Sequence, residues 1–178
     1  MKSLPAIFLV LSLMTSASLA ETPSAEQVLA GAKTKAAAEQ KAIFVHFGAS
    51  WCGWCKKLDA YLVQPDVKPV FEKYFVPVKL VMGEHPPQKD LENAGADDLA
   101  KKLGGPGFPF HAFLDAQGAL IVNSNREPGR QNIGYPAEPD EVDWFLQMIK
   151  KAAPKITDAD LKTLETPLRT PPPAANAK

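Results

Sequence analysis

The chain contains only two cysteines, Cys52 and Cys55, and they stand in the stretch WCGWCKKL. A disulfide between them closes too short a loop to restrict the unfolded chain much, so the spacing argues against a structural crosslink. Cys-X-X-Cys pairs instead indicate redox chemistry or metal binding. In both cases the thiolate is the reactive form. We therefore predict a redox-active or metal-binding pair.

The flanking sequence suggests a different role for each cysteine. The apolar run Ala42–Gly48 is typical of a strand covered on both faces, and a helix is predicted from near Cys52 to Leu62. Backbone N–H groups and the positive end of the dipole at a helix start favour thiolate over thiol. We therefore expect Cys52 to be the attacking thiol. Cys55, one turn on and more buried, is expected to resolve the mixed disulfide.

A histidine, His46, interrupts the apolar run six residues before Cys52. A neutral imidazole can accept a proton near neutral pH, which leads to the hypothesis that His46 is the base for Cys55. The alternative is a core histidine bonded to backbone or water, with no kinetic role. Of the other histidines, His111 is expected to be an ordinary strand residue and His85 to be exposed.

The elements that must position these side chains follow from hydrophobic periodicity and turn residues. A strand, a crossover helix and a second strand imply a parallel pair, to which a later hairpin adds antiparallel strands. We therefore predict one mixed sheet with helices on both faces, which is an α/β sandwich. Beyond those given above, the expected elements are a helix from Ser24 to about Gln40, a short helix before a strand at Phe75–Val81, a loop at Met82–Ala96, a short helix ending at Gly104–Gly105, a hairpin at Phe110–Ser124, a polar loop at Asn125–Ala137, a helix at Pro139–Ala152 and one or two further helical turns capped by Thr157.

The segments GASWCGWCKKL, GFPFHAFLDAQG and NIGYPAEPDEVDWFLQMIKKAAP resemble the thioredoxin superfamily, and more narrowly its exported bacterial thioredoxin-like members. The resemblance extends over about Thr22 to Asp160. It implies a thioredoxin-like three-layer sandwich with a central mixed β-sheet. It also implies a thiol–disulfide oxidoreductase whose only redox group is the Cys52–Cys55 disulfide, with no further cofactor.

The resemblance also implies a substrate-binding segment. A proline just before the hairpin strand is cis in the superfamily and faces the cysteines; of Pro106 and Pro109, we select Pro109 because it directly precedes the strand. The backbone of Phe108 would then pair with an extended substrate segment. The position of His46 commonly holds a buried carboxylate in relatives. The substrate-binding residues expected on this basis are Trp51, Gly53, Trp54, Phe108 and Pro109.

One residue leaves the direction of electron flow open. Trp54, between the cysteines, replaces the commoner proline or histidine of relatives and supplies neither rigidity nor charge. A reductase or an oxidase is compatible with the sequence, and a single domain without a dimerisation segment makes an isomerase the least expected and a monomer the expected state. Two alternatives remain: a copper or zinc protein that uses Cys52, Cys55 and one or two histidines, and a binding module whose cysteines are incidental.

The ends of the chain differ from the centre. Residues 1–20 have the pattern of a signal peptide cleaved near Ala20, with an apolar run too short to span a membrane comfortably. This predicts a periplasmic or secreted domain at 21–165 and a Pro-rich disordered tail at 166–178. The chain has 20 basic and 20 acidic residues, which argues against a nucleic-acid-binding surface. Expected partners are protein substrates with cysteines or disulfides and an unidentified electron donor or acceptor.

Overall fold

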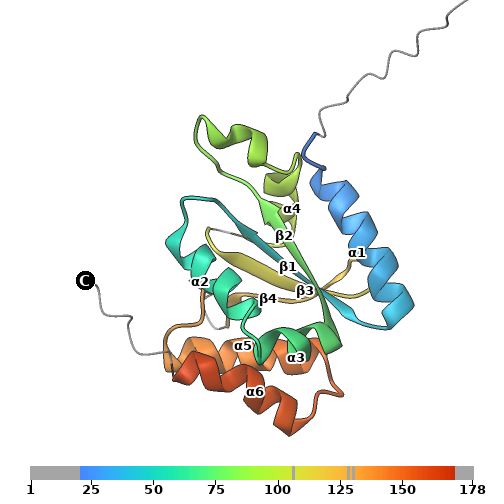
Figure 1. Cartoon of the computed structure of the whole chain (residues 1–178), viewed down its shortest axis with the longest axis vertical. Coiled ribbons are helices and arrows are strands. Elements are labelled where there is room, and N and C mark those ends of the chain that lie inside the picture. The colour runs from blue at the N-terminus through green and yellow to red at the C-terminus, as the bar shows by residue number, and fades with distance from the viewer. Residues whose placement is uncertain (1–20, 106, 128, 130, 171–178) are drawn as a thin grey trace, which may run out of the picture.

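A central sheet with helices on both faces organises the molecule (Figure 1). The computed structural model describes residues 21–105, 107–127, 129 and 131–170, so the predicted signal peptide lies outside the described residues. In chain order the elements are α1 (Ala25–Glu39), β1 (Ala42–Gly48), α2 (Gly53–Leu62), α3 (Val67–Tyr74), β2 (Phe75–Val81), the 3₁₀ turn η1 (Gln88–Leu91), α4 (Ala96–Lys102), β3 (Phe110–Leu114), β4 (Leu120–Asn123), β5 (Asn125–Arg126), β6 (Gln131–Asn132), α5 (Pro139–Ala152) and α6 (Asp158–Arg169). None of the helices in this part of the chain has both the length and the apolar character needed to cross a bilayer.

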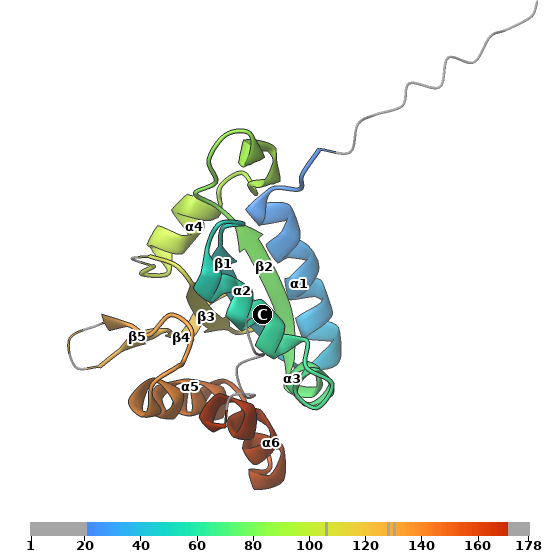
Figure 2. The same cartoon turned by 60° about the vertical axis from the view of Figure 1, so that its left-hand side comes forward.

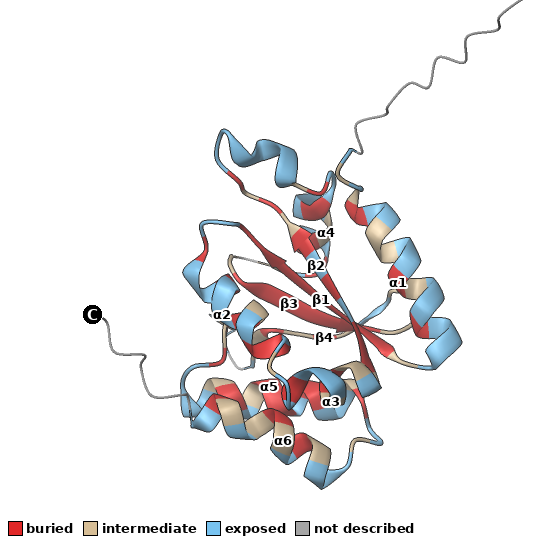
Figure 3. Ribbon diagram, in the orientation of Figure 1, coloured by how far each residue is buried: buried red, intermediate tan, exposed pale blue. Residues whose placement is uncertain are grey.

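The sheet has the strand order β2-β1-β3-β4. Strand β1 pairs in parallel with β2 and antiparallel with β3, and β4 pairs antiparallel with β3. The predicted α/β sandwich with a central mixed sheet is confirmed. The alternation of side chains along β1 explains its two covered faces, because Phe44 packs with residues of α2, α3, α5 and α6, whereas Val45 and Phe47 pack with residues of α1 and α4. Figure 2 shows α1 and α2 on opposite sides of the sheet, and Figure 3 shows that the buried residues concentrate on the strands.

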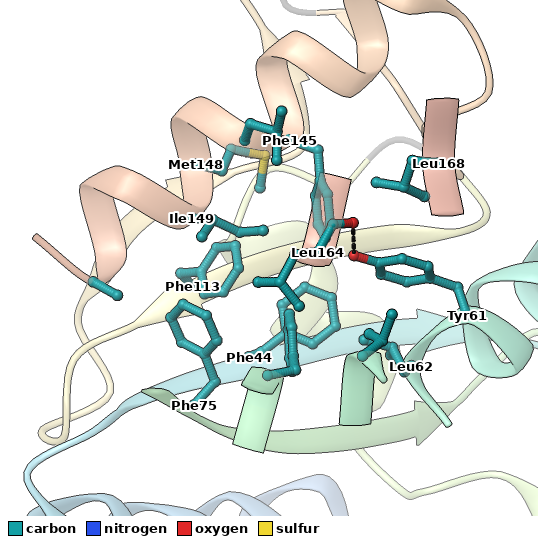
Figure 4. Close-up of a cluster of buried hydrophobic side chains, with 14 of the residues drawn as sticks. Phe44, Tyr61, Leu62, Phe75, Phe113, Phe145, Met148, Ile149, Leu164 and Leu168 are labelled. Atoms are coloured by element: carbon teal, nitrogen blue, oxygen red, sulfur yellow. Dashed lines mark hydrogen bonds between the residues drawn. The ribbon is translucent and has the colours of Figure 1, made fainter. Parts of the chain in front are cut away.

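The face under α2, α3, α5 and α6 has an aromatic core (Figure 4). Phe44 lies at its centre. Its ring centroid is 5.1 Å from that of Phe71 and 5.0 Å from that of Phe113. The hydroxyl of Tyr61 donates to the carbonyl of Leu164 at 2.7 Å and so ties α2 to α6. Helix α2 buries Cys55, Leu58, Tyr61 and Leu62, so it has buried side chains from its first turn to its last.

The strand register brings two loops to one edge of the sheet. Phe47, near the end of β1, lies opposite Phe110 at the start of antiparallel β3. The loop that leaves β1 toward Cys52 and the segment that enters β3 through Pro109 therefore meet at the same edge. The sheet thus places the predicted cysteine pair beside the predicted substrate-binding segment.

The structure differs from the prediction in the stretch after the hairpin. The polar loop expected at Asn125–Ala137 contains a small ladder in which β5 pairs antiparallel with β6, and this ladder extends away from the main sheet (Figure 2). Each of its strands has two residues, which is too short for any alternation of polar and apolar residues to show in the sequence.

The predicted boundary of the tail at residue 166 is also wrong. Helix α6 continues through Pro167 to Arg169, twelve residues in all, rather than one or two turns. Proline removes one backbone hydrogen bond, but Leu164 and Leu168 are buried and Arg169 pairs with Glu165 and Asp143. Tertiary packing of the apolar face therefore outweighs the cost of proline in the last turns. Residues 171–178 lie outside the described residues.

Candidate active site

The two cysteines form a disulfide at the start of α2. Cys52 is the N-cap residue of this helix, and its Sγ accepts a hydrogen bond from the backbone N–H of Cys55 at 3.1 Å. Cys52 is 6% exposed and Cys55 is 1% exposed, so the first cysteine is the one nearer to solvent. A helix N-terminus stabilises a thiolate at the N-cap once the disulfide is reduced. The arrangement fits an attacking Cys52 and a shielded Cys55.

The loop before the helix is held by a buried carboxylate that the sequence did not reveal. Glu84 is only 2% exposed, and its carboxylate accepts bonds from the backbone N–H of Ser50 and from the Ser50 hydroxyl, the latter at 2.7 Å. Trp51 is bound on the same side, because its indole N–H donates to the carbonyl of Gly83 at 2.9 Å. The Trp51 ring stacks on exposed His85. These contacts hold the backbone of the two residues that precede Cys52.

Phe108 and Pro109 lie against the cysteine pair. The peptide bond between them is cis, and the Phe108 side chain packs with Ala49, Cys52 and Cys55. Pro106, the other candidate, lies outside the described residues. The structure thus brings the predicted substrate-binding segment to the disulfide.

The carbonyl of Pro109 has a partner that the sequence analysis missed. The amide of Asn132, in β6, donates to this carbonyl at 2.9 Å and accepts from the hydroxyl of buried Ser124 at 2.7 Å. The small β5–β6 ladder therefore serves as a clamp on the segment beside the cysteines. No local pattern indicates this contact, since Asn132 is 23 residues from Pro109 in sequence.

The surface around the disulfide is aromatic. Trp51 and Trp54 are 49% and 50% exposed, and Gly53 lies exposed between the cysteines. Trp54 stacks on Tyr135 with 5.9 Å between ring centroids, and the Lys57 ammonium lies 4.0 Å from the Trp54 ring centroid. Next to this stack is a groove of about 340 Å³ whose lining includes Trp54, Phe108, Pro109 and Tyr135. Exposed rings beside a reactive sulfur provide area for binding another polypeptide.

Below the disulfide, His46 forms a polar cluster with two residues that the sequence analysis did not select. Its Nε2 lies 2.8 Å from Oδ1 of Asp59 in α2, and Oδ2 of Asp59 accepts from the Lys79 ammonium of β2 at 2.5 Å. Partial burial alone would raise the pKa of the Asp59 carboxyl, but the bonds to His46 and Lys79 outweigh it and lower the pKa to about 2. Asp59 is therefore ionised at neutral pH. Its signal in the sequence was its place one helical turn after Cys55.

The second buried histidine, His111, lies directly opposite His46 in the β1–β3 register. It is fully buried, and its ring touches the rings of Phe44 and Phe145. Burial, with a smaller contribution from neighbouring His46, lowers the pKa of His111 to about 3, so this ring is neutral at neutral pH. The expectation of an ordinary strand residue at His111 did not anticipate its full burial opposite His46.

Within residues 21–105, 107–127, 129 and 131–170, no group of three or more His, Cys, Asp or Glu side chains could hold a metal ion. His46, the histidine nearest to the cysteines along β1, is bonded to Asp59 instead. The copper- or zinc-binding alternative therefore gains no support from the described residues.

Comparison with known proteins places the site in a family. The profile of a family described as thioredoxin-like matches residues 24–116. No curated protein matched. Among solved structures, the chain is similar to a disulphide isomerase from Xylella fastidiosa Temecula1 (19% identity, 81% of this chain and 87% of that chain, TM-score 0.43). It is also similar to the C-terminal domain of DsbD from Neisseria meningitidis (22%, 72% and 99%, 0.43) and to a putative disulphide-isomerase from Bacteroides thetaiotaomicron (21%, 75% and 91%, 0.47).

Proposed function

The chain belongs to the thioredoxin-like family, and on that premise we propose that it is an exported thiol–disulfide oxidoreductase that exchanges disulfides with other proteins. The observation that carries the proposal is the Cys52–Cys55 disulfide, which opens α2 directly beside the Phe108–Pro109 segment. This arrangement puts a thiolate-stabilising helix start and a peptide-binding surface at one place. The redox-active disulfide is the only redox group that the reaction requires.

In the reducing direction, the thiolate of Cys52 attacks one sulfur of a substrate disulfide and forms a mixed disulfide. The other substrate sulfur leaves as a thiolate. Cys55 then attacks Sγ of Cys52, so the Cys52–Cys55 disulfide forms and the second substrate cysteine is released. The substrate gains two electrons and the pair loses two, which a partner protein carrying thiols must restore.

The substrate lies as an extended segment along Phe108 and Pro109. The Asn132 clamp on the Pro109 carbonyl keeps this backbone in place for strand-like pairing. Trp51, Gly53 and Trp54 form the surface on either side of the reacting sulfur, and Tyr135 extends it through its stack on Trp54. A reductase rather than an isomerase, acting as a monomer, is part of this proposal.

His46 serves as the base for Cys55. It lies on the same face of β1 as Gly48, and a side chain built on Gly48 would meet Cys55 Sγ at 2.9 Å, so α2 packs directly over this part of the strand. The imidazole accepts the Cys55 proton when the mixed disulfide is resolved. Export rests on the N-terminal pattern of residues 1–20, and a mature protein that begins at Glu21, read from its intact mass, would support cleavage there.

The test is covalent capture of substrates in the exporting cell. Cys55→Ala leaves the mixed disulfide unresolved, so we expect proteins linked to Cys52 that a reductant releases. Cys52→Ala is the matched control, since it removes the attacking sulfur and keeps the other cysteine. Complexes formed equally by Cys52→Ala, or by neither variant, would contradict the proposal.

A further inference from the structure

The carboxylate of Asp59 is divided between two partners. Oδ1 faces Nε2 of His46 at 2.8 Å, and Oδ2 accepts from the Lys79 ammonium at 2.5 Å. An ionised carboxylate can only accept hydrogen bonds, so the proton in the first contact belongs to Nε2 of His46. The contact therefore selects one tautomer of the neutral ring, with a proton on Nε2 and a lone pair on Nδ1.

The other ring nitrogen of His46, Nδ1, has no hydrogen-bond partner among the described residues. It is also buried. In the tautomer that Asp59 selects, this nitrogen is an acceptor. Its lone pair can therefore take a proton from a donor that lies beside it.

Helix α2 packs over β1 so that Cys55 and His46 lie on the same face of the sheet, about two strand positions apart. Two residues along a strand advance by roughly 6.6 Å and four residues along a helix by roughly 6 Å. Cys55 and Asp59 are four apart on α2, and the residues beneath them, Gly48 and His46, are two apart on β1. Asp59 is bonded to His46, and Cys55 Sγ lies over the bare α-carbon of Gly48. Since Gly48 has no side chain, none from β1 stands between the imidazole and the sulfur.

The charged and titratable groups around His46 come from four elements. Asp59 and Cys55 belong to α2, and Lys79 faces His46 from the register position opposite it on β2. His111 faces it from β3 and is neutral at neutral pH. A cavity of about 300 Å³ reaches the cluster from outside, and the α3 residues that line it include Lys68 and Glu72, which pair with each other. Of these groups, only the Asp59 carboxylate forms a hydrogen bond with the imidazole of His46.

We propose that Asp59, held by Lys79, is a positioning residue that fixes His46 in the tautomer protonated on Nε2 and so leaves Nδ1 to accept the proton of Cys55. This inference rests on the proposed function. In the resolving step the Cys55 thiol gives its proton to Nδ1, and the resulting thiolate bonds to Cys52 Sγ. The bond between Cys52 and the substrate sulfur breaks, and the substrate leaves as a thiolate. The imidazolium, stabilised by Asp59, then releases a proton to water through the cavity.

Asp59→Asn tests this through the tautomer of His46. Lys79 can only donate, so it draws the amide oxygen of the new side chain and turns the amide NH₂ toward His46. Nε2 must then accept, which moves the ring proton to Nδ1 and removes the acceptor for Cys55. Asp160→Asn is the matched control, because Asp160 also accepts from a lysine and also has a pKa of about 2, but it lies on α6 and contacts neither cysteine nor histidine.

Two measurements on the reduced protein read the outcome. Correlation spectra of ¹⁵N and ¹H in the imidazole report which nitrogen of His46 carries the proton at pH 7. Dithionitrobenzoate, a symmetrical aromatic disulfide, releases one coloured thiolate when Cys52 attacks it and a second when Cys55 resolves the adduct. We expect wild-type protein and Asp160→Asn to show the proton on Nε2. We expect Asp59→Asn to show it on Nδ1, with the second release slowed at least about 10-fold and the first unchanged.

The wild-type spectrum is decisive even if Asp59→Asn does not fold, because a proton on Nδ1 in the wild type overturns the inference. An unchanged tautomer in Asp59→Asn also overturns it, as does an inverted tautomer with an unchanged second release. Failure of the proposed function looks different, since the wild type would then release no second thiolate while the His46 tautomer could be as described.

Discussion

The two buried histidines lie side by side across β1 and β3, yet their surroundings are opposite. His46, under α2, is bonded to an ionised carboxylate and lines a cavity that leads outside. His111, under α5, is enclosed by Phe44 and Phe145, and neither of its ring nitrogens finds a hydrogen-bond partner among the described residues. The difference shows that the helix covering each histidine decides its surroundings, because α2 supplies a carboxylate to His46 and α5 supplies an aromatic ring to His111. In the proposed mechanism His46 gains and loses a proton, whereas burial lowers the pKa of His111 and keeps that ring neutral at neutral pH.

Replacing each histidine by leucine should give the largest difference in the rate at which the mixed disulfide is resolved. His46→Leu should slow resolution of the Cys52 mixed disulfide by about 10²- to 10⁴-fold at pH 7, the usual contribution of a general base. His111→Leu should leave this rate within about 3-fold, because His111 receives no proton at that pH. Stopped-flow measurement of the second dithionitrobenzoate release distinguishes them. Equal effects of the two variants would remove the basis of the comparison.

The next largest effect is expected from Phe145, whose ring packs against His111. Phe145 is fully buried, and its ring centroid lies 5.4 Å from that of His111. Phe145→Ala should lower the free energy of unfolding by about 3–5 kcal/mol through loss of buried area and a cavity. The resolution rate per folded molecule should not change. Chemical denaturation together with the kinetic assay checks this, and a variant that is stable but slow would place Phe145 with the reaction instead.

The pH dependence of stability separates the histidines further. The folded-state pKa of His111 is about 3, below its ordinary value of 6.5. Between these values the unfolded chain binds more protons than the folded chain, so the free energy of unfolding falls as the pH falls below about 6.5. This group contributes at most about 1.4 kcal/mol per pH unit. Between pH 6 and 4, the free energy of unfolding of His111→Leu, taken from denaturation curves, should therefore change less with pH than that of the wild type. An identical slope would show that His111 is not kept neutral.

Lys79 gives the smallest expected effect. Its side chain is 44% exposed, and exposed ion pairs contribute about 0–1 kcal/mol. Lys79→Met should slow resolution by about 2- to 5-fold, because Asp59 loses the partner that orients it but still accepts from His46. The imidazole spectrum should keep the proton on Nε2. A slowing as large as that of His46→Leu would mean that Lys79 itself handles the proton.

The sequence was sufficient for the elements that form locally. The apolar run of β1, the Cys-X-X-Cys pair at a helix start and the proline before the hairpin strand could each be read from neighbouring residues, and their meeting at one edge follows from the strand register. The helix predicted from Ser24 also forms locally, with Ser24 as the N-cap of α1. These features need no knowledge of how distant parts pack.

What the sequence could not supply depends on long-range packing. Asp59 was not selected from the sequence, and only the packing of α2 on β1 shows that it bonds to His46. Asn132 and Glu84 lay in stretches that were taken for polar loops, yet one clamps Pro109 and the other holds Ser50. Pro167 pointed to a tail, whereas the burial of Leu164 and Leu168 keeps α6 intact.

The central claim is that Cys52 and Cys55 act in sequence on a substrate disulfide, and its most direct test is a single turnover of the reduced protein with a disulfide-linked peptide, followed by mass spectrometry. The account predicts that the wild type yields reduced peptide and a Cys52–Cys55 disulfide, and that Cys55→Ala stops at a peptide linked to Cys52. Cys52→Ala should leave the peptide oxidised. Reduction of the peptide by Cys52→Ala, or a stable adduct on Cys55 in the wild type, would contradict the assignment of the two roles.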